Sequence, residues 1–214
     1  MIGVMPNPSA YRRAVSTYIG TTLDTSDLAT VTLADVAIGP PAPDRMVVAV
    51  ILGRDANART ISGVTIGGVS ATAAVTSPSQ NNPTGIYYAL VPGGTTADIV
   101  VTFSNNTSRV AVSVYSLTGY RNGAPASVDQ DYSGATTLSA TLNRPRDAVV
   151  IAGSITSSTG TYTWTGLTED SDSAISSGRA SAASASFSAA DPAMSVSFVN
   201  TSSGAASLCA ATWT

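Results

Sequence analysis

The supply of charged side chains constrains the fold of this chain more than any other feature of its sequence. Only 11% of its 214 residues are charged, less than half the usual share of about 25%. All ten basic residues are Arg, Glu169 is the only Glu, and neither Lys nor His occurs. Helical proteins normally cover their solvent faces with Glu and Lys, which are good helix formers. Here Ser, Thr, Asn and Asp have to cover the surface, and because they suit strands and turns, the composition predicts an all-β fold.

Short β-rich runs separated by Gly, Pro, Asn and Asp fill the chain from about residue 16 onward. Residues 46–52 are continuously apolar, as expected of a strand covered on both faces. In 109–117, valines alternate with other residues, the pattern of a half-buried strand. We therefore predict an antiparallel two-sheet β-sandwich that is jelly-roll-like. Its core should contain Val47, Val48, Val50, Val112, Val114, Val149, Val150, Val196 and Phe198.

Two pairs of similar strings indicate that the sandwich consists of two duplicated halves. Asp44-Arg45-Met46-Val47-Val48 resembles Arg146-Asp147-Ala148-Val149-Val150, and Val101-Thr102-Phe103 is echoed by Val196-Ser197-Phe198. The alternative is chance similarity between segments rich in Val, Ser and Thr.

The domain organisation that we predict is an N-terminal arm at residues 1–15 followed by a single β-sandwich domain at residues 16–214. The arm is too apolar for a solvated tail, and a short apolar segment outside a domain core is best explained by burial against another subunit. Packing of the arm on its own domain is the alternative. The residues expected to dock are Met1, Ile2, Val4, Met5, Tyr11, Arg12 and Arg13.

Catalytic and cofactor chemistry has few candidate residues in this sequence. Without His there is no Ser-His-Asp or Cys-His arrangement, and without Lys there is no Schiff base and no P-loop. Cys209 lies in an apolar run and is expected to be a small core residue. We predict a protein that is not an enzyme and binds no cofactor or metal. The carboxylate clusters, which could serve catalysis or bind Ca²⁺ but are more simply solvated turn residues, are Asp129-Gln130-Asp131 and Glu169-Asp170-Ser171-Asp172.

Aromatic residues are better candidates for a binding surface. Tyr120, Tyr132 and Tyr162 lie in polar, loop-like contexts, where an exposed ring often marks a contact site. Together with Asp129 and Asp131 they are the predicted contacts to a glycan or a partner. The remaining large aromatics are expected to fill the core, namely Tyr87, Tyr88, Tyr115, Trp164 and Trp213.

Charge and hydropathy also limit the partners. A net charge of −3 and the absence of a basic run argue against nucleic acid. The N-terminal segment lacks the pattern of a signal peptide, and no apolar stretch approaches the roughly 20 residues that span a bilayer. We therefore expect a soluble protein, made and assembled in a cytoplasm, that binds neither nucleic acid nor membrane.

Several strings resemble a β-rich module common in virion proteins of tailed bacteriophages. They begin with Asp44-Arg45-Met46-Val47-Val48-Ala49-Val50 and continue at residues 58–72, 86–92, 98–104, 114–119 and 164–170. These motifs bear on the fold and carry no active site. The resemblance covers most of residues 18–214, and this chain has little beyond the module, which favours a small accessory protein over a full-length fibre.

The resemblance implies a structural component on the exterior of a phage particle, either a capsid decoration or a tail accessory protein. The alternative is a glycan-binding receptor-recognition module of the tail-fibre or adhesin type. The implied partners are other virion proteins and, in the alternative, a host surface glycan. The chain itself is expected to form a homo-oligomer, with a trimer among the options. The implied location is the virion, assembled in the bacterial host cytoplasm.

Overall fold

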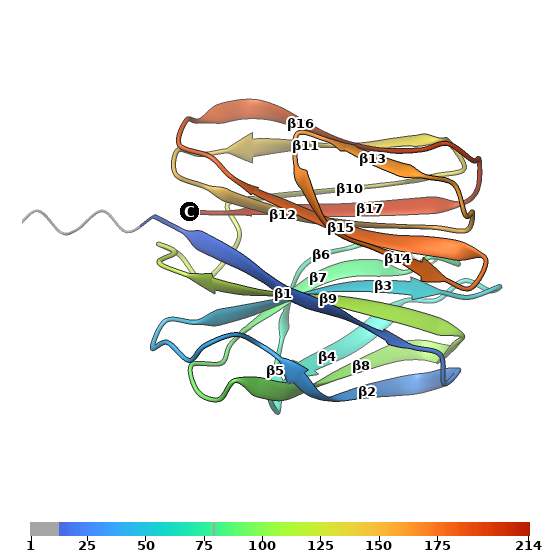
Figure 1. Cartoon of the computed structure of the whole chain (residues 1–214), viewed down its shortest axis with the longest axis horizontal. Coiled ribbons are helices and arrows are strands. Elements are labelled where there is room, and N and C mark those ends of the chain that lie inside the picture. The colour runs from blue at the N-terminus through green and yellow to red at the C-terminus, as the bar shows by residue number, and fades with distance from the viewer. Residues whose placement is uncertain (1–12, 79) are drawn as a thin grey trace, which may run out of the picture.

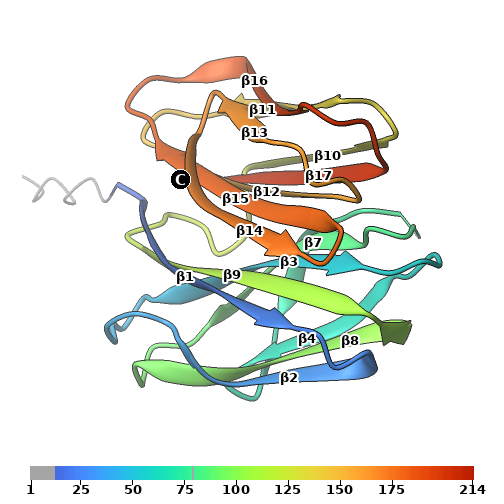
Figure 2. The same cartoon turned by 45° about the vertical axis from the view of Figure 1, so that its right-hand side comes forward.

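The computed structural model describes residues 13–78 and 80–214, and these residues form strands and turns without a helix. Figure 1 shows the strands as four stacked layers, and the turned view in Figure 2 shows the same stack. The prediction of an antiparallel, all-β sandwich is confirmed. The described strands form four sheets where two were expected, because the chain builds one two-sheet sandwich after another.

The first sandwich, here called the N-terminal half, contains β1 (Val15–Asp24), β2 (Leu28–Ala37), β3 (Met46–Arg54), β4 (Ile61–Ile66), β5 (Val69–Ser70), β6 (Thr72–Thr76), β7 (Thr84–Leu90), β8 (Thr96–Thr107) and β9 (Arg109–Thr118). Its inner sheet has the order β1-β9-β3-β7-β6, and its outer sheet has the order β2-β8-β4-β5. Gly67 and Gly68 have positive φ in the turn between β4 and β5, as a two-residue hairpin turn requires.

The second sandwich, here called the C-terminal half, contains β10 (Ser127–Ser133), β11 (Thr137–Arg144), β12 (Val149–Thr156), β13 (Tyr162–Thr165), β14 (Thr168–Ile175), β15 (Gly178–Ser186), β16 (Asp191–Asn200) and β17 (Ala206–Trp213). Its inner sheet has the order β10-β17-β12-β15-β14, and its outer sheet has the order β11-β16-β13. The two inner sheets face each other in the middle of the stack (Figure 1).

The two halves repeat one strand order. β1-β9-β3-β7 corresponds to β10-β17-β12-β15, and β2-β8-β4 corresponds to β11-β16-β13. Each half pairs its first strand with its last and its second with its next to last. This shared order is what a duplicated unit would produce.

The similar strings in the sequence fall on corresponding strands, but one pair is out of register. Val101 and Val196 are both buried in the outer half-cores, on β8 and β16. On β3 and β12, however, Val47 faces the outer sheet of its half, whereas Val149 faces the central layer. The side chains of successive strand residues alternate between faces. The string comparison therefore matched the right strands with a shift of one residue.

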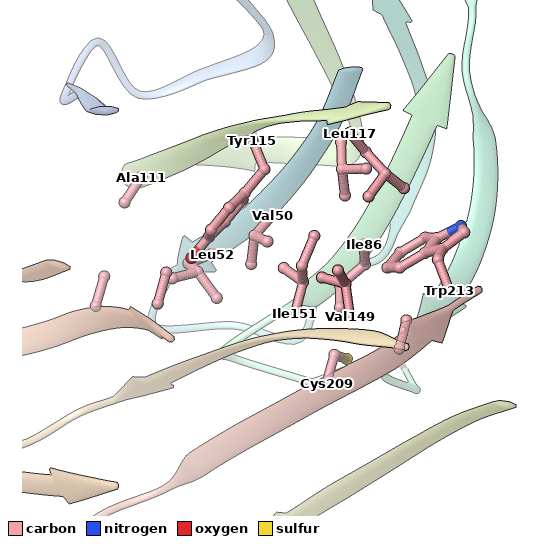
Figure 3. Packing of buried hydrophobic residues seen from close by; sticks show 14 of the residues in the cluster. Val50, Leu52, Ile86, Ala111, Tyr115, Leu117, Val149, Ile151, Cys209 and Trp213 are labelled. Carbon is pink, nitrogen blue, oxygen red and sulfur yellow. The ribbon is translucent and has the colours of Figure 1, made fainter. Parts of the chain in front are cut away.

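Three hydrophobic clusters fill the spaces between the four layers. One lies within each half, between its inner and outer sheets, and the third lies between the two inner sheets. Figure 3 shows the central cluster, in which Val50, Leu52 and Ile86 of the N-terminal half meet Ile151 and Trp213 of the C-terminal half. Because the inner sheets are covered on both faces, β12 and β17 are buried along their whole length.

All nine side chains expected in the core are buried with an exposed fraction of 0%. The aromatics expected there behave similarly: Tyr87, Tyr115, Trp164 and Trp213 are buried, and Tyr88 packs half-buried against the central cluster. Cys209 is also buried there, and burial raises the pKa of its thiol far above the ordinary value. These core predictions are confirmed.

Candidate functional site

Asp129 and Asp131 hold two sheets of the C-terminal half together. They lie on β10, the edge strand of the inner sheet, and point toward β11, the edge strand of the outer sheet. One carboxylate oxygen of Asp129 accepts the Thr141 N–H at 2.7 Å, and one of Asp131 accepts the Ser139 N–H at 3.0 Å. Both side chains thus bind backbone N–H groups on the edge of β11 that point away from its partner strand, β16. The Asp-x-Asp spacing serves this bridge between sheets.

Tyr132 and Tyr120 lie on either side of these carboxylates along the chain. Tyr132 is 41% exposed on β10, and its hydroxyl donates to the side-chain oxygen of Asn81 at 3.4 Å. Tyr120, in the connection between β9 and β10, packs half-buried against the central cluster. Burial raises the pKa of Tyr120, and the negative charge of Asp44 raises it further. Of the two rings, only Tyr132 therefore offers a broad exposed face.

Tyr162 belongs to the C-terminal core. Its ring lies 4.7 Å from that of Phe198, and its hydroxyl donates to the Ser158 carbonyl at 2.9 Å. Burial raises the pKa of Tyr162 to about 12, and the charge of Asp172 acts in the same direction. β13, which carries Tyr162, and β11, which is bonded to Asp129 and Asp131, are opposite edges of the outer sheet. The structure therefore does not bring the five predicted contact residues together.

The arm residues Met1, Ile2, Val4, Met5, Tyr11 and Arg12 lie outside the described residues. Arg13 is exposed directly before β1. Its carbonyl approaches Gly119 so closely that a Cβ on Gly119 would lie 2.5 Å from the carbonyl oxygen.

The second carboxylate cluster is divided between two faces of β14. Asp170 accepts a hydrogen bond from the Tyr115 hydroxyl at 2.8 Å, across the central layer. Asp172 forms a two-point ion pair with Arg179, in which the Arg179 Nε contact measures 2.7 Å. Among residues 13–78 and 80–214, no group of three or more His, Cys, Asp or Glu side chains is placed to hold a metal ion.

A pocket of about 180 Å³ lies where the ends of the two halves meet, and the sequence alone did not single it out. β3 and β9 of the N-terminal half supply one wall, and the turn between β14 and β15 supplies the other. Its lining residues are Arg54, Asp55, Ala56, Ser108, Arg109, Ser176 and Ser177. The pocket is therefore polar and sits at the open end of the central layer.

Arg54 and Arg109 are the charged side chains that dominate this pocket. They are direct partners across the β3–β9 pair; Arg54 follows the central-facing Leu52 by two positions, and Arg109 precedes the central-facing Ala111 by two. Both guanidinium groups therefore project toward the C-terminal half. Arg54 donates to the Thr156 carbonyl at 3.3 Å and to the Ser177 hydroxyl at 2.9 Å. Burial lowers the pKa of Arg54, and the nearby charge of Arg109 adds to the shift.

Asp55 is already engaged at the rim of the pocket. Its carboxylate accepts the Ser108 hydroxyl at 2.8 Å and lies 3.0 Å from Arg59. Burial acts to raise the pKa of Asp55, but hydrogen bonds from Asn57 and Ser108, with Arg59 beside them, hold it below the ordinary value. Asp55 is thus charged at neutral pH and is neutralised by Arg59, so it does not neutralise Arg54 or Arg109.

Most other arginines of the described chain are paired with an Asp or buried against backbone carbonyls, whereas Arg13 and Arg146 are exposed, and Arg146 donates to the Ser188 carbonyl at 3.3 Å. Arg45 is fully buried and donates to backbone carbonyls, including that of Val91 at 2.8 Å, which ties together two chain connections. The arginines paired with an Asp are Arg59, Arg121, Arg144 and Arg179. Neither Arg54 nor Arg109 pairs with a carboxylate in the described part of the chain. Because these two also line the pocket, they are the candidate functional residues.

Sequence reasoning missed this pair because the two residues are far apart along the chain. Each looks like an ordinary polar residue at the end of an apolar run. Only the pairing of β3 with β9 places them side by side. The one available signal was that each Arg stands at one end of a predicted strand, Arg54 after residues 46–52 and Arg109 before the alternating valines.

Comparisons with known proteins add little to this geometry. No protein-family model and no curated protein matches the sequence. A solved structure titled anti-sigma factor domain-containing protein is similar over 86% of this chain and 79% of its own, with 8% identity and a TM-score of 0.25. A likeness this weak carries no argument about fold or function. Across the described residues, no helix has the length and apolar character needed to cross a membrane.

Proposed function

We propose that this chain is a non-enzymatic structural component on the exterior of a phage-type particle, as a capsid decoration or a tail accessory protein. The observation that carries the proposal is the central cluster, which joins two sandwiches into one continuous block. A stack in which both inner sheets are buried on two faces is a stiff body that can display edges and loops in a fixed geometry. That property suits a part that is repeated on a particle surface.

The surface supports the same role. Strands β10 and β14 are rich in Ser, Asp and Thr, with few of the Lys and Glu side chains that are costly to desolvate in an interface. On β10, Val128 and Tyr132 are each 41% exposed, and because they are four residues apart they lie on one face of the strand. This face of an edge strand is the contact surface that we propose for a neighbouring virion protein or a second copy.

The test is immunogold electron microscopy of purified phage particles, using an antibody raised against the full chain. The expected result is regular labelling of intact capsids or tails. Val128→Ser combined with Tyr132→Ser should reduce the amount of chain that copurifies with particles, with Thr141→Ser on the neighbouring strand as the matched control. Labelling confined to soluble lysate, with none on particles, would contradict the proposal.

The alternative is a glycan-binding receptor-recognition module, and one observation favours it. The ring of Tyr132 is exposed beside polar strand residues, an arrangement suited to stacking on a sugar ring. Binding of the full chain to intact host cells, competed by extracted surface polysaccharide and lost in Tyr132→Ala, would support this alternative. Cell binding that Tyr132→Ala leaves unchanged would remove it.

A further inference from the structure

We propose that the pocket between the two halves binds the carboxylate of a small hydroxylated acid, of the acidic-sugar class, between Arg54 and Arg109. This inference does not depend on where the protein is located. It rests on the charges that line the pocket, on the donors and acceptors around them, and on a comparison with the equivalent place in the other half.

The two guanidinium groups leave an excess of positive charge in the pocket. Arg59 and Asp55 neutralise each other, so Arg54 and Arg109 contribute two positive charges without a carboxylate partner among the described residues. Like charges on directly opposite strand residues repel each other. A bound anion would relieve that repulsion. The planar fork of Arg matches the two oxygens of a carboxylate, and such charge-assisted bonds are stronger than neutral ones.

The remaining lining matches hydroxyl groups on the same ligand. Ser176 and Ser177 contribute side-chain hydroxyls that can donate and accept, and the Ser108 hydroxyl, which already donates to Asp55, can accept. A ligand that combines a carboxylate with several hydroxyls uses both sets of groups. The volume of about 180 Å³ is small beside the roughly 300–1,000 Å³ of pockets for drug-sized ligands. It therefore suits a single sugar-sized unit.

The backbone at Gly178, which has no Cβ, leaves room for the Arg54 side chain. A Cβ on Gly178 would lie 2.1 Å from the Thr156 carbonyl oxygen and 2.7 Å from Arg54 Nη1. Only a glycine at this position lets the β14–β15 turn close over the arginine. Ser176 holds a positive φ of 59° in that turn, and Ser177 then reaches the guanidinium. The turn thus contacts Arg54, while Arg109 donates from Nη1 to the carbonyl of its neighbour Ser108.

The C-terminal half has the same strand order without an arginine pair at the corresponding place. In the strand pairing, Arg54 and Arg109 correspond to Ser157 and Ala205 of the C-terminal half, which also face each other. There the place is filled by the chain itself, because the Asn82 side chain donates to the Ala205 carbonyl at 2.6 Å. At this position of the C-terminal half the Asn82 amide of the N-terminal half is bound, whereas in the N-terminal half two arginines line a pocket.

The experiment is isothermal titration of the full chain with sodium glucuronate at constant, low ionic strength, because salt screens exposed charges. Glucose and sodium acetate serve as matched ligands that carry only the hydroxyls or only the carboxylate. Glucuronate should bind more tightly than either. Arg109→Gln should weaken glucuronate binding about tenfold or more, as expected from the loss of a charge-assisted pair. Arg146→Gln, which removes the same charge from an exposed site, should not.

Three results would overturn the inference. Equal affinity for glucose would remove the role of the carboxylate, and equal affinity for acetate would remove the sugar class. Glucuronate binding that Arg109→Gln leaves unchanged would place the ligand elsewhere. Circular dichroism and thermal melting of both Gln variants would verify that each is folded before titration. Particle localisation is measured separately, so neither outcome of the titration decides the proposed structural role.

Discussion

The two halves of the molecule share a strand order but fill the central layer with side chains of different size. The N-terminal half contributes large residues such as Met46, Leu52 and Tyr115. The C-terminal half combines large residues such as Ile151 and Trp213 with more small ones, because Ala180, Ala182, Cys209 and Ala211 face the same layer. A unit packed against an identical copy would present the same volumes on both sides. The difference shows that the halves have become complementary partners within one chain.

The fit between the two halves is clearest at Gly153, where a side chain of the N-terminal half fills the space that the glycine leaves. This glycine lies on β12 opposite β3, and a Cβ added to it would lie 2.2 Å from Val50 Cγ1. The equivalent residue on β3 is Val50 itself, since the pairing with β9 and β17 places them alike. At this position the N-terminal half therefore has a valine, and the C-terminal half has a glycine that leaves room for it. Close packing of this kind should make the two halves unfold together.

The largest expected effect is the loss of Trp213, the largest side chain that the C-terminal half places in the central cluster. Its side chain is fully buried in the central layer and meets the Tyr88 ring edge-on at 6.1 Å. Trp213→Ala should lower the free energy of unfolding by about 3–5 kcal/mol, the usual cost of truncating a buried aromatic. Chemical denaturation, followed by circular dichroism and by Trp164 fluorescence, measures the change.

The same measurement tests whether the halves are coupled. Trp164 reports the outer core of the C-terminal half, whereas circular dichroism reports all strands. We expect both signals to change at one denaturant concentration in the variant, as in the parent chain. Two separate transitions, with one half as stable as before, would show that the central layer does not bind them into a cooperative unit.

Gly153→Ala should have the next largest effect. The added methyl group overlaps Val50, and overpacking of a filled core typically costs about 1–3 kcal/mol. Gly134→Ala is the matched control, because nothing lies within 4 Å of a Cβ at that exposed turn position. Adding Val50→Ala to Gly153→Ala should recover part of the lost stability. If the double variant is simply the sum of two destabilisations, the proposed complementarity at this point is wrong.

The parts of the fold that the sequence predicted are those where apolar residues decide the structure. Residues 46–52 lie within β3, and the alternating valines near residue 112 lie on β9, which is buried on both faces and not half-buried as their alternation predicted. The polar strands β10 and β14 were missed, because SVDQDYS and TEDSDSAI carry neither an apolar run nor a clean alternation. Both are edge strands of the inner sheet, and pairing with a buried neighbour holds them in place.

The number of layers was missed for a related reason. A continuous apolar strand indicates burial on both faces, but it does not say whether a helix, a sheet or a second sandwich covers the other face. The predicted site was affected in the same way. Asp129 and Asp131 were singled out by their spacing, and only their position opposite β11 shows that they satisfy backbone N–H groups.

A smaller effect is expected at the contact between the edge strand of the inner sheet and the edge strand of the outer sheet, where the two halves differ. In the C-terminal half, Asp129 bonds the N–H of Thr141, whereas no described side chain of β1 bonds a β2 N–H in this way. Asp129→Ala should cost about 1 kcal/mol, because the bond is exposed to water. Asp129→Asn keeps an acceptor and should cost less. Faster hydrogen exchange at Thr141 in the Ala variant would verify the bond, and unchanged exchange would contradict it.

The smallest expected effect concerns the arginine pair, which only the N-terminal half carries. Arg54 and Arg109 face each other across β3 and β9, and directly opposite like charges destabilise a strand pair by a fraction of 1 kcal/mol, roughly 0.2–1. Arg109→Gln removes the repulsion and keeps a polar side chain. Its free energy of unfolding should therefore exceed that of the parent chain by a few tenths of a kcal/mol at low salt.

Salt dependence separates this repulsion from any packing effect of the substitution. The Debye length falls from about 30 Å at 0.01 M to about 3 Å at 1 M ionic strength, so the gain from Arg109→Gln should vanish in 1 M salt. Arg146→Gln removes an exposed Arg in the other half and should show no such gain at either concentration. A gain that persists in 1 M salt would arise from packing rather than charge. A loss of stability at low salt would mean that Arg109 contributes more through its own contacts than it costs through repulsion, and the pocket would then be part of the scaffold.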